Sequence, residues 1–248
     1  MGVIYILWLR ELKRYFRSKP QMIASLGQPV LYLLALGFGM GPVYQQAGRG
    51  SYIQFLAPGV IGMTVLFSSV FSGMGLLWDR QFGFLKETLV APVPRFLIMA
   101  GRTLGSATVA MLQGSLVAIV CVIAGFRPVS VAMVPLGLLF MLMIAIVFAA
   151  LGTAIGSALK DMQGFQMTMN FLVLPIFFLS GALFPLSNLP RVMGWITSAD
   201  PLAYGIDGMR SALLGMTHFG PVLDGAVLVG VALLFLSLGA YSFSRIEV

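Results

Sequence analysis

Charged residues divide this chain into long apolar stretches. Asp, Glu, Lys and Arg gather at a few places and leave six long stretches without them. A helix needs roughly 20 mainly apolar residues to cross a hydrocarbon core about 30 Å thick, because lipid offers the backbone no hydrogen-bond partners. The pattern therefore predicts an all-α membrane protein with six transmembrane helices, near residues 22–42, 56–78, 103–124, 131–157, 165–184 and 222–243.

The composition agrees with this pattern. Of 248 residues, 59% are hydrophobic and 9% are charged, whereas an ordinary soluble domain carries about 25% charged residues. We expect one transmembrane domain over residues 1–248.

The positive charges predict how the chain is oriented. One side of the predicted spans holds four Lys or Arg residues, Arg49, Arg127, Arg191 and Arg210, and the other side holds the remaining eleven. Because cytoplasmic loops are enriched in Lys and Arg, we expect both termini in the cytoplasm of a multi-pass plasma-membrane protein, the inner membrane of a bacterium. The net charge of +7 then favours contact with anionic lipid and not with nucleic acid.

The first 20 residues pass from an apolar, aromatic stretch into a basic one and end at Pro20. Trp8 and Tyr15 suit the headgroup boundary, and Arg10 and Arg14 are able to reach lipid phosphates. We expect an interfacial helix over 1–20. The alternative is a basic flank that stops translocation.

The segment 79–102 is the longest charged stretch on the predicted cytoplasmic side, and its part 79–95 is the candidate coupling segment. Apolar residues at helical spacing alternate with charges, and Pro92 and Pro94 stop the pattern. A short amphipathic helix there would either pack on its own bundle or dock on a cytosolic partner. The residues that define its two faces are Arg80, Phe82, Leu85, Lys86 and Glu87.

Residues 184–221 are apolar but are broken by prolines. We expect an extracellular hairpin of two half-length helices, near 188–198 and 201–215, that re-enters the outer leaflet. Trp195 and Tyr204 would anchor it at the outer interface. Asp200 precedes Pro201 as a helix cap, and the spacing of Asp207 and Arg210 allows them to pair.

Candidate chemistry is sparse. The sequence has no GxxxxGK[ST] phosphate loop, so we expect no nucleotide site in this chain. The single cysteine, Cys121, and the single histidine, His218, have no partners at ligand spacing, so we predict no metal site and no catalytic residues. The proposed span cores lack ionisable groups, which disfavours ion-coupled transport.

Mildly polar and adaptable side chains mark a candidate translocation path. Polar groups in the second and fifth spans are accompanied by methionine and phenylalanine, which repack around varied apolar ligands. Hydrogen bonding between helices is the alternative role for the polar members. The candidate residues are Ser69, Ser72, Gln166, Met169, Asn170 and Phe177.

Glycines spaced four apart predict close helix packing. Three such pairs lie within or beside the predicted spans: Gly37 with Gly41, Gly101 with Gly105, and Gly152 with Gly156.

Three stretches together resemble a known family. They read YIQFLAPGVIGM at 52–63, DRQFGFLKETLVAPVPR at 79–95 and FLSGALFPLSNLPRVMGWITSADPLAYGIDGMR at 178–210. In this order they are similar to the permease of type 2 ATP-binding-cassette exporters, a group with drug, nodulation-factor and polysaccharide exporters. Asp79 stands where the family more often has Glu, and Phe84 and Ala91 stand where small hydroxyl residues are frequent.

The resemblance implies an exporter of an amphipathic, drug-like or lipid-linked substrate. A separate ATPase subunit would bind ATP and Mg, dock on a coupling helix within 79–95, and serve a pair of permeases, a homodimer. Residues 184–215 would close the outer gate, with Phe184, Pro185, Pro190 and Tyr204 as its candidate residues. From the residues alone, an energy-independent channel and a lipid-modifying membrane enzyme remain alternatives.

Overall fold

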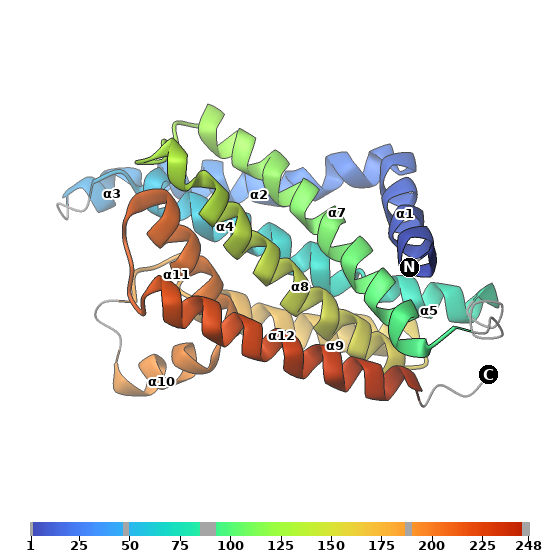
Figure 1. Cartoon of the computed structure of the whole chain (residues 1–248). Coiled ribbons are helices and arrows are strands. Elements are labelled where there is room, and N and C mark those ends of the chain that lie inside the picture. Colours follow the sequence, from blue (N-terminus) through green and yellow to red (C-terminus); the bar gives the residue numbers. More distant parts are fainter. Residues whose placement is uncertain (1, 47–49, 85–92, 187–189, 245–248) are drawn as a thin grey trace.

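The computed structural model describes residues 2–46, 50–84, 93–186 and 190–244. Within these ranges the chain is helical and contains no strand, as the sequence predicts (Figure 1). The helices are α1 (Gly2–Arg17), α2 (Lys19–Gly39), α3 (Gly41–Gln46), α4 (Tyr52–Phe71), α5 (Met74–Gln81), α7 (Arg95–Ile123), α8 (Val134–Ala158), α9 (Met162–Leu179), α10 (Arg191–Ala199), α11 (Pro201–Leu214) and α12 (Pro221–Ser244), with a 3₁₀ turn, η1 (Val131–Met133), before α8.

The described part of the chain holds six candidate membrane spans, which confirms the predicted number. They are Met22–Gly39, Tyr52–Gln81, Arg95–Ile123, Val131–Ala158, Met162–Leu179 and Pro221–Phe243. The ends differ from the sequence-based ranges. The third span begins eight residues earlier than predicted, because α7 continues past Arg102 to Arg95. The fifth span ends five residues earlier, where Gly181 turns the chain with a φ of +73°.

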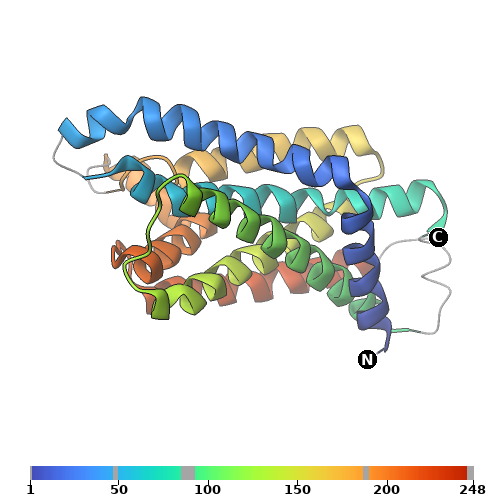
Figure 2. The ribbon, with the colours of Figure 1, turned by 90° about the horizontal axis from the view of Figure 1, so that it is seen from above.

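The second span forms the centre of the bundle. Two thirds of its most apolar window is buried, compared with about a sixth of the windows in α2 and α12. Its helix, α4, packs against α2, α7, α8 and α11, and α12 lies along α8 (Figures 1 and 2). The described residues therefore leave most of the surface of α2, α9 and α12 uncovered.

Helix α1 crosses one end of the bundle, transverse to the spans (Figure 2). It packs on α7 at the predicted pair Gly101 and Gly105. A Cβ on Gly101 would lie 3.1 Å from Cα of Ile4, and one on Gly105 would lie 2.9 Å from Cβ of Glu11. Glycine thus lets the crossing helix lie directly on the α7 backbone.

The pair Gly152 and Gly156 brings α8 against the junction of α4 and α5. A Cβ on Gly152 would lie 2.3 Å from the Val70 carbonyl oxygen, and one on Gly156 would lie 2.6 Å from the Gly73 carbonyl oxygen. This contact is backbone to backbone, as the spacing predicts. Gly41 has open space around it, so the pair at 37 and 41 does not form such a contact.

Two short helices, α10 and α11, follow the fifth span close to the predicted positions. Asp200 caps α11, since its carboxylate accepts a hydrogen bond from the Leu202 N–H at 2.9 Å. Trp195 on α10 is exposed, but Tyr204 is buried: its ring stacks on Phe219. The expectation that Tyr204 anchors the hairpin at the outer interface is therefore wrong.

Candidate functional site

The predicted coupling segment begins where α5 ends. Arg80 donates a hydrogen bond to the Leu159 carbonyl oxygen at 3.3 Å, which joins the end of the second span to the end of α8. Phe82 is exposed, and its ring stacks on that of Trp78. The other three candidate residues, Leu85, Lys86 and Glu87, lie outside the described residues.

Asp79 connects three helices at this end of the bundle. Its two carboxylate oxygens pair with Arg10 of α1 and Arg102 of α7, and the carboxylate itself lies on α5. Asp79 and Arg102 are buried, whereas the Arg10 side chain is about one third exposed. The negative charge of the carboxylate offsets the positive charges of the two guanidinium groups, and burial of these charges without a partner would cost free energy. The Asp79 cluster thus fastens α1 and α7 to the end of the second span.

A cleft of about 500 Å³ opens beside this cluster, between α1, α2, α4, α5 and α7. Its size is within the usual range for ligand sites, about 300–1,000 Å³. Aromatic and thioether side chains form one part of its wall, namely Met63, Phe67, Phe71, Met74 and Trp78. Hydroxyl and amide groups form another part, namely Tyr15, Ser25, Gln28, Thr64, Ser68, Ser72, Ser106 and Gln113. This mixed lining suits an amphipathic ligand.

The candidate path residues are not brought together in this cleft. Ser72 lines it and donates a hydrogen bond to the Ser69 carbonyl oxygen at 2.6 Å, while the Ser69 side chain is fully buried. On α9, Met169 and Phe177 are buried in the core. Gln166 and Asn170 are exposed on the same helix and do not line the cleft.

At the opposite end of the bundle, Arg210 fixes the segment that follows α9. Its guanidinium donates to the carbonyl oxygens of Ala182 at 3.1 Å and Phe55 at 3.3 Å, and it lies 3.8 Å above the Phe55 ring centroid. The backbone approaches α4 closely here, because a Cβ on Gly59 would lie 2.2 Å from the Ala182 oxygen. Arg210 therefore clamps this segment between α4 and α11.

The Asp207 carboxylate is hydrogen-bonded to the turn between α11 and α12, and it does not pair with Arg210. Its carboxylate accepts hydrogen bonds from the backbone N–H groups of His218 and Phe219, at 2.8 to 2.9 Å, and from the Thr217 hydroxyl at 3.2 Å. The spacing-based expectation of an Asp207–Arg210 pair is thus wrong, because the turn and the Ala182 and Phe55 carbonyls offer each side chain closer partners.

The four gate candidates lie around the segment that Arg210 fixes. Phe184 and Pro185 are half-buried after α9, and Pro190 is exposed at the start of α10. Tyr204 reaches back to α10, since its hydroxyl donates to the Ser198 carbonyl oxygen at 2.8 Å. The Tyr52 hydroxyl similarly donates to the Leu183 carbonyl oxygen, also at 2.8 Å. These contacts join α10 to α11, and the segment after α9 to the beginning of α4.

The side chains described above form hydrogen bonds and line a cleft, and they do not form a cluster of reactive groups. Among the described residues, no three His, Cys, Asp or Glu side chains lie together as metal ligands would, and Cys121 is buried in the core. The family model for ABC-2 type transporters matches residues 2–214.

The chain belongs to the ABC-2 type transporter family.

Individual ABC-2 relatives match over most of this chain. Nodulation protein J of Rhizobium leguminosarum bv. viciae is 28% identical over 236 residues, which cover 92% of this chain and 89% of the relative. The inner membrane transport permease YadH of Escherichia coli K12 is 27% identical, with 90% and 87% covered. The putative transport permease ycf38 of Porphyra purpurea is 29% identical, with 79% and 68% covered.

Membership identifies this chain as a transmembrane permease subunit of an ABC transporter, which implies an ATP-binding-cassette partner. The Asp79 cluster, the cleft and the Arg210 clamp are accordingly parts of a translocation subunit. In the sequence, Asp79 stands out only as a departure from a family motif. Its ion pairs with Arg10 and Arg102 could not be predicted, because both arginines are far from it along the chain.

Proposed function

We propose that this ABC-2 permease is the membrane part of an ATP-driven exporter. It moves an amphipathic, drug-like or lipid-linked substrate out of the cytoplasm, while a separate subunit binds ATP and Mg. The family match over residues 2–214 carries the proposal. The sequence has no phosphate loop, so the energy must come from another chain.

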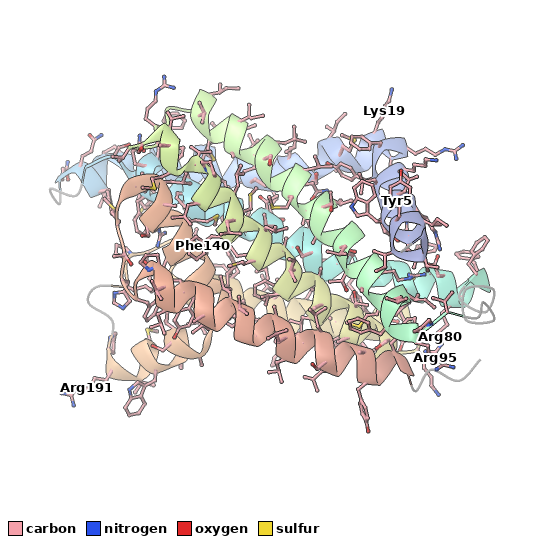
Figure 3. All side chains as sticks on the ribbon, viewed as in Figure 1. Tyr5, Lys19, Arg80, Arg95, Phe140 and Arg191 are labelled. Atoms are coloured by element: carbon pink, nitrogen blue, oxygen red, sulfur yellow. The ribbon has the colours of Figure 1, made fainter. Side chains whose placement is uncertain are left out.

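The end of the bundle crossed by α1 is, in this proposal, the cytoplasmic end. Lys19, Arg80 and Arg95 lie there, and Arg191 lies at the opposite end (Figure 3). The beginning of α1 and the end of α12 are also at this end (Figure 1). Because positive charge is retained in the cytoplasm, this arrangement supports cytoplasmic termini in a bacterial inner-membrane protein, with α1 at the membrane surface.

Coupling to the ATPase uses Arg80, Phe82, Leu85, Lys86 and Glu87 as the docking surface. The segment that carries them joins α5 to α7, and both of these helices contribute to the Asp79 cluster. A displacement of the docked segment therefore acts on two spans and, through Arg10, on α1. The Asp79 cluster would transmit a movement of the docked ATPase to α1, α5 and α7.

Two permease copies work with two ATPases. The outward face of α9 presents Gln166 and Asn170, which do not line this chain's own cleft. Facing a second copy, Gln166 and Asn170 would line a shared path, whereas Met169, Phe177 and Ser69 are buried in this chain and would support that face from within. The segment clamped by Arg210, with Phe184, Pro185, Pro190 and Tyr204, closes that path on the outer side.

Docking is tested with the cognate ATP-binding-cassette ATPase, co-expressed with this permease and purified through a tag on the permease. Reversing both charges in Lys86→Glu/Glu87→Lys is expected to remove most of the co-purifying ATPase activity. Arg191→Glu, at the opposite end of the bundle, is the control and is expected to keep it. Equal ATPase recovery with all three proteins would contradict the assigned docking surface.

A further inference from the structure

Two opposite charges face the cleft without a protein partner. Glu11 and Arg14 both line it from α1, one helical turn apart. Neither has a hydrogen bond or an ion pair with any residue that the structure describes, whereas their neighbour Arg10 is bound to Asp79. A Cβ on Gly75 would lie 3.0 Å from the Arg14 guanidinium, so glycine leaves room for this side chain at the wall.

A third polar group at the same place is buried. Tyr15 also lines the cleft; the residue is 5% exposed, and its hydroxyl lies beside Gln113, another residue of the cleft wall. The two side chains do not form a hydrogen bond of regular geometry, so the hydroxyl is able to donate to a ligand. Three adjacent groups, an anion, a cation and a hydroxyl, therefore point into one space.

With α1 at the membrane surface, as proposed above, the cleft lies at the level of the phospholipid headgroups. Helix α1 crosses the end of the spans (Figure 2), and the cleft extends from α1 along α4, past Phe71 and Phe67 to Met63. A ligand seated there has its polar end at the bundle terminus and its apolar end beside the membrane-spanning helices. The charged groups of the lining thus lie at α1 alone, and aromatic and thioether side chains, interspersed with hydroxyl and amide groups, follow along α4.

We propose that this cleft binds one zwitterionic phospholipid, with its phosphate against Arg14 and its ammonium against Glu11. A guanidinium binds phosphate by charge-assisted hydrogen bonds, and a carboxylate accepts them from a primary ammonium. The Tyr15 hydroxyl donates to a phosphate or ester oxygen, and Phe67, Phe71 and Met63 contact the chains. Glu11 repels an anionic headgroup that lacks an ammonium. The site depends on membrane insertion and not on the proposed export function.

The test uses the full chain purified in a neutral detergent, with lipid added back. Bound lipid is counted by native mass spectrometry, and the apparent unfolding temperature is followed, because a ligand that binds only the folded state stabilises it. The probes are dioleoyl phosphatidylethanolamine, dioleoyl phosphatidylglycerol and chain-free glycerophosphoethanolamine. The variants are Glu11→Gln, Arg14→Gln, Arg14→Lys and, as a matched control on α1, Arg17→Gln, which does not line the cleft.

We expect the wild-type chain to retain phosphatidylethanolamine in preference to phosphatidylglycerol. Arg14→Gln should weaken retention about tenfold, the usual effect of one charged hydrogen bond. Arg14→Lys should retain part of it, which separates loss of the site from loss of the fold. Glu11→Gln should weaken retention of phosphatidylethanolamine and strengthen that of phosphatidylglycerol, and Arg17→Gln should match the wild type.

Three results would overturn the proposal. The first is equal retention of both lipids by the wild-type chain. The second is an equal loss in Arg17→Gln and Arg14→Gln, which would indicate unspecific attraction to the basic helix. The third is a shift in unfolding temperature with glycerophosphoethanolamine as large as that with the intact lipid, because the ligand would then be a soluble phosphate compound.

Discussion

Asp79 lies between the guanidinium groups of Arg10 and Arg102, and this position decides how the residue contributes to stability. A buried carboxylate that balances two cations is costly to remove, since the cations then repel each other in a poorly solvated place. Charge patterning along the chain does not reveal such a cluster. Its members are separated by 69 and 23 residues, and only the folding of α1, α5 and α7 brings them together.

Replacing this carboxylate gives the first prediction. Asp79→Asn is expected to lower the free energy of unfolding in mild detergent by about 3 kcal/mol, the lower end of the range for a broken buried pair, because Arg10 is partly hydrated. Chemical denaturation followed by circular dichroism measures the change. Asp161→Asn, at an exposed helix cap that asparagine serves equally well, is the control. A variant at 79 that is as stable as this control would refute the structural role of the cluster.

Asp200 gives a pH-dependent prediction. Its carboxylate caps α11, but burial raises the pKa of Asp200 to about 7 from an ordinary value of 3.8. The folded chain therefore holds this proton between about pH 4 and pH 7, where the unfolded chain has lost it. The contribution of Asp200 to stability consequently falls as the pH rises through this window.

The variant Asp200→Asn keeps the cap and removes the titration. Above pH 7 it is expected to be more stable than the wild type, and its apparent unfolding temperature should decline less between pH 4 and pH 7. Differential scanning fluorimetry across this range measures both effects. Identical pH profiles for the two proteins would show that Asp200 ionises normally in the folded chain.

At the scale of elements, the apolar stretches predicted the six spans well because each stretch needs a helix to satisfy its backbone in lipid. The ends were less accurate. Charges marked the predicted ends, yet α7 continues beyond Arg102 because that arginine is neutralised by Asp79 and tolerates burial. The glycine spacing predicted two of the close contacts, whereas at Gly41 no second helix approaches.

The contact between α8 and the end of α4 gives a prediction at this scale. Gly152→Ala is expected to destabilise the bundle, since its Cβ would meet the rigid Val70 carbonyl group at 2.3 Å. Gly230→Ala on α12, where nothing lies within 4 Å, should be neutral or slightly stabilising through its helix propensity. Thermal unfolding in detergent compares the two. If both alanines behaved alike, the helices would not cross this closely.

At the scale of the whole molecule, the chain's membership of the ABC-2 family was predictable from three ordered motifs, but the cleft was not. Its walls come from five helices, and only Ser72 of the six candidate path residues lines it. Polarity within a single span does not say which face of that span meets a neighbour. Gln166 and Asn170 remain predictions for a surface that a second permease copy would complete.

Orientation is also a property of the whole molecule. In a Cys121→Ala background, Val192→Cys at the Arg191 end should react with a membrane-impermeant maleimide in intact cells. Gln163→Cys, near the α8–α9 turn, should react only after the membrane is permeabilised. Both side chains are exposed, and neither change alters the charge pattern. The opposite labelling pattern would reverse the assigned topology.

We propose that this chain transports substrate only together with an ATPase partner. The direct measurement is uptake into inside-out vesicles that contain this permease and its cognate ATP-binding-cassette ATPase, with hydrophobic dyes and lipid-linked glycans as substrates. We predict uptake that requires ATP and disappears when the phosphate-loop lysine of the partner is replaced. Equal uptake without ATP, or by the permease alone in liposomes, would contradict the account and indicate an energy-independent channel.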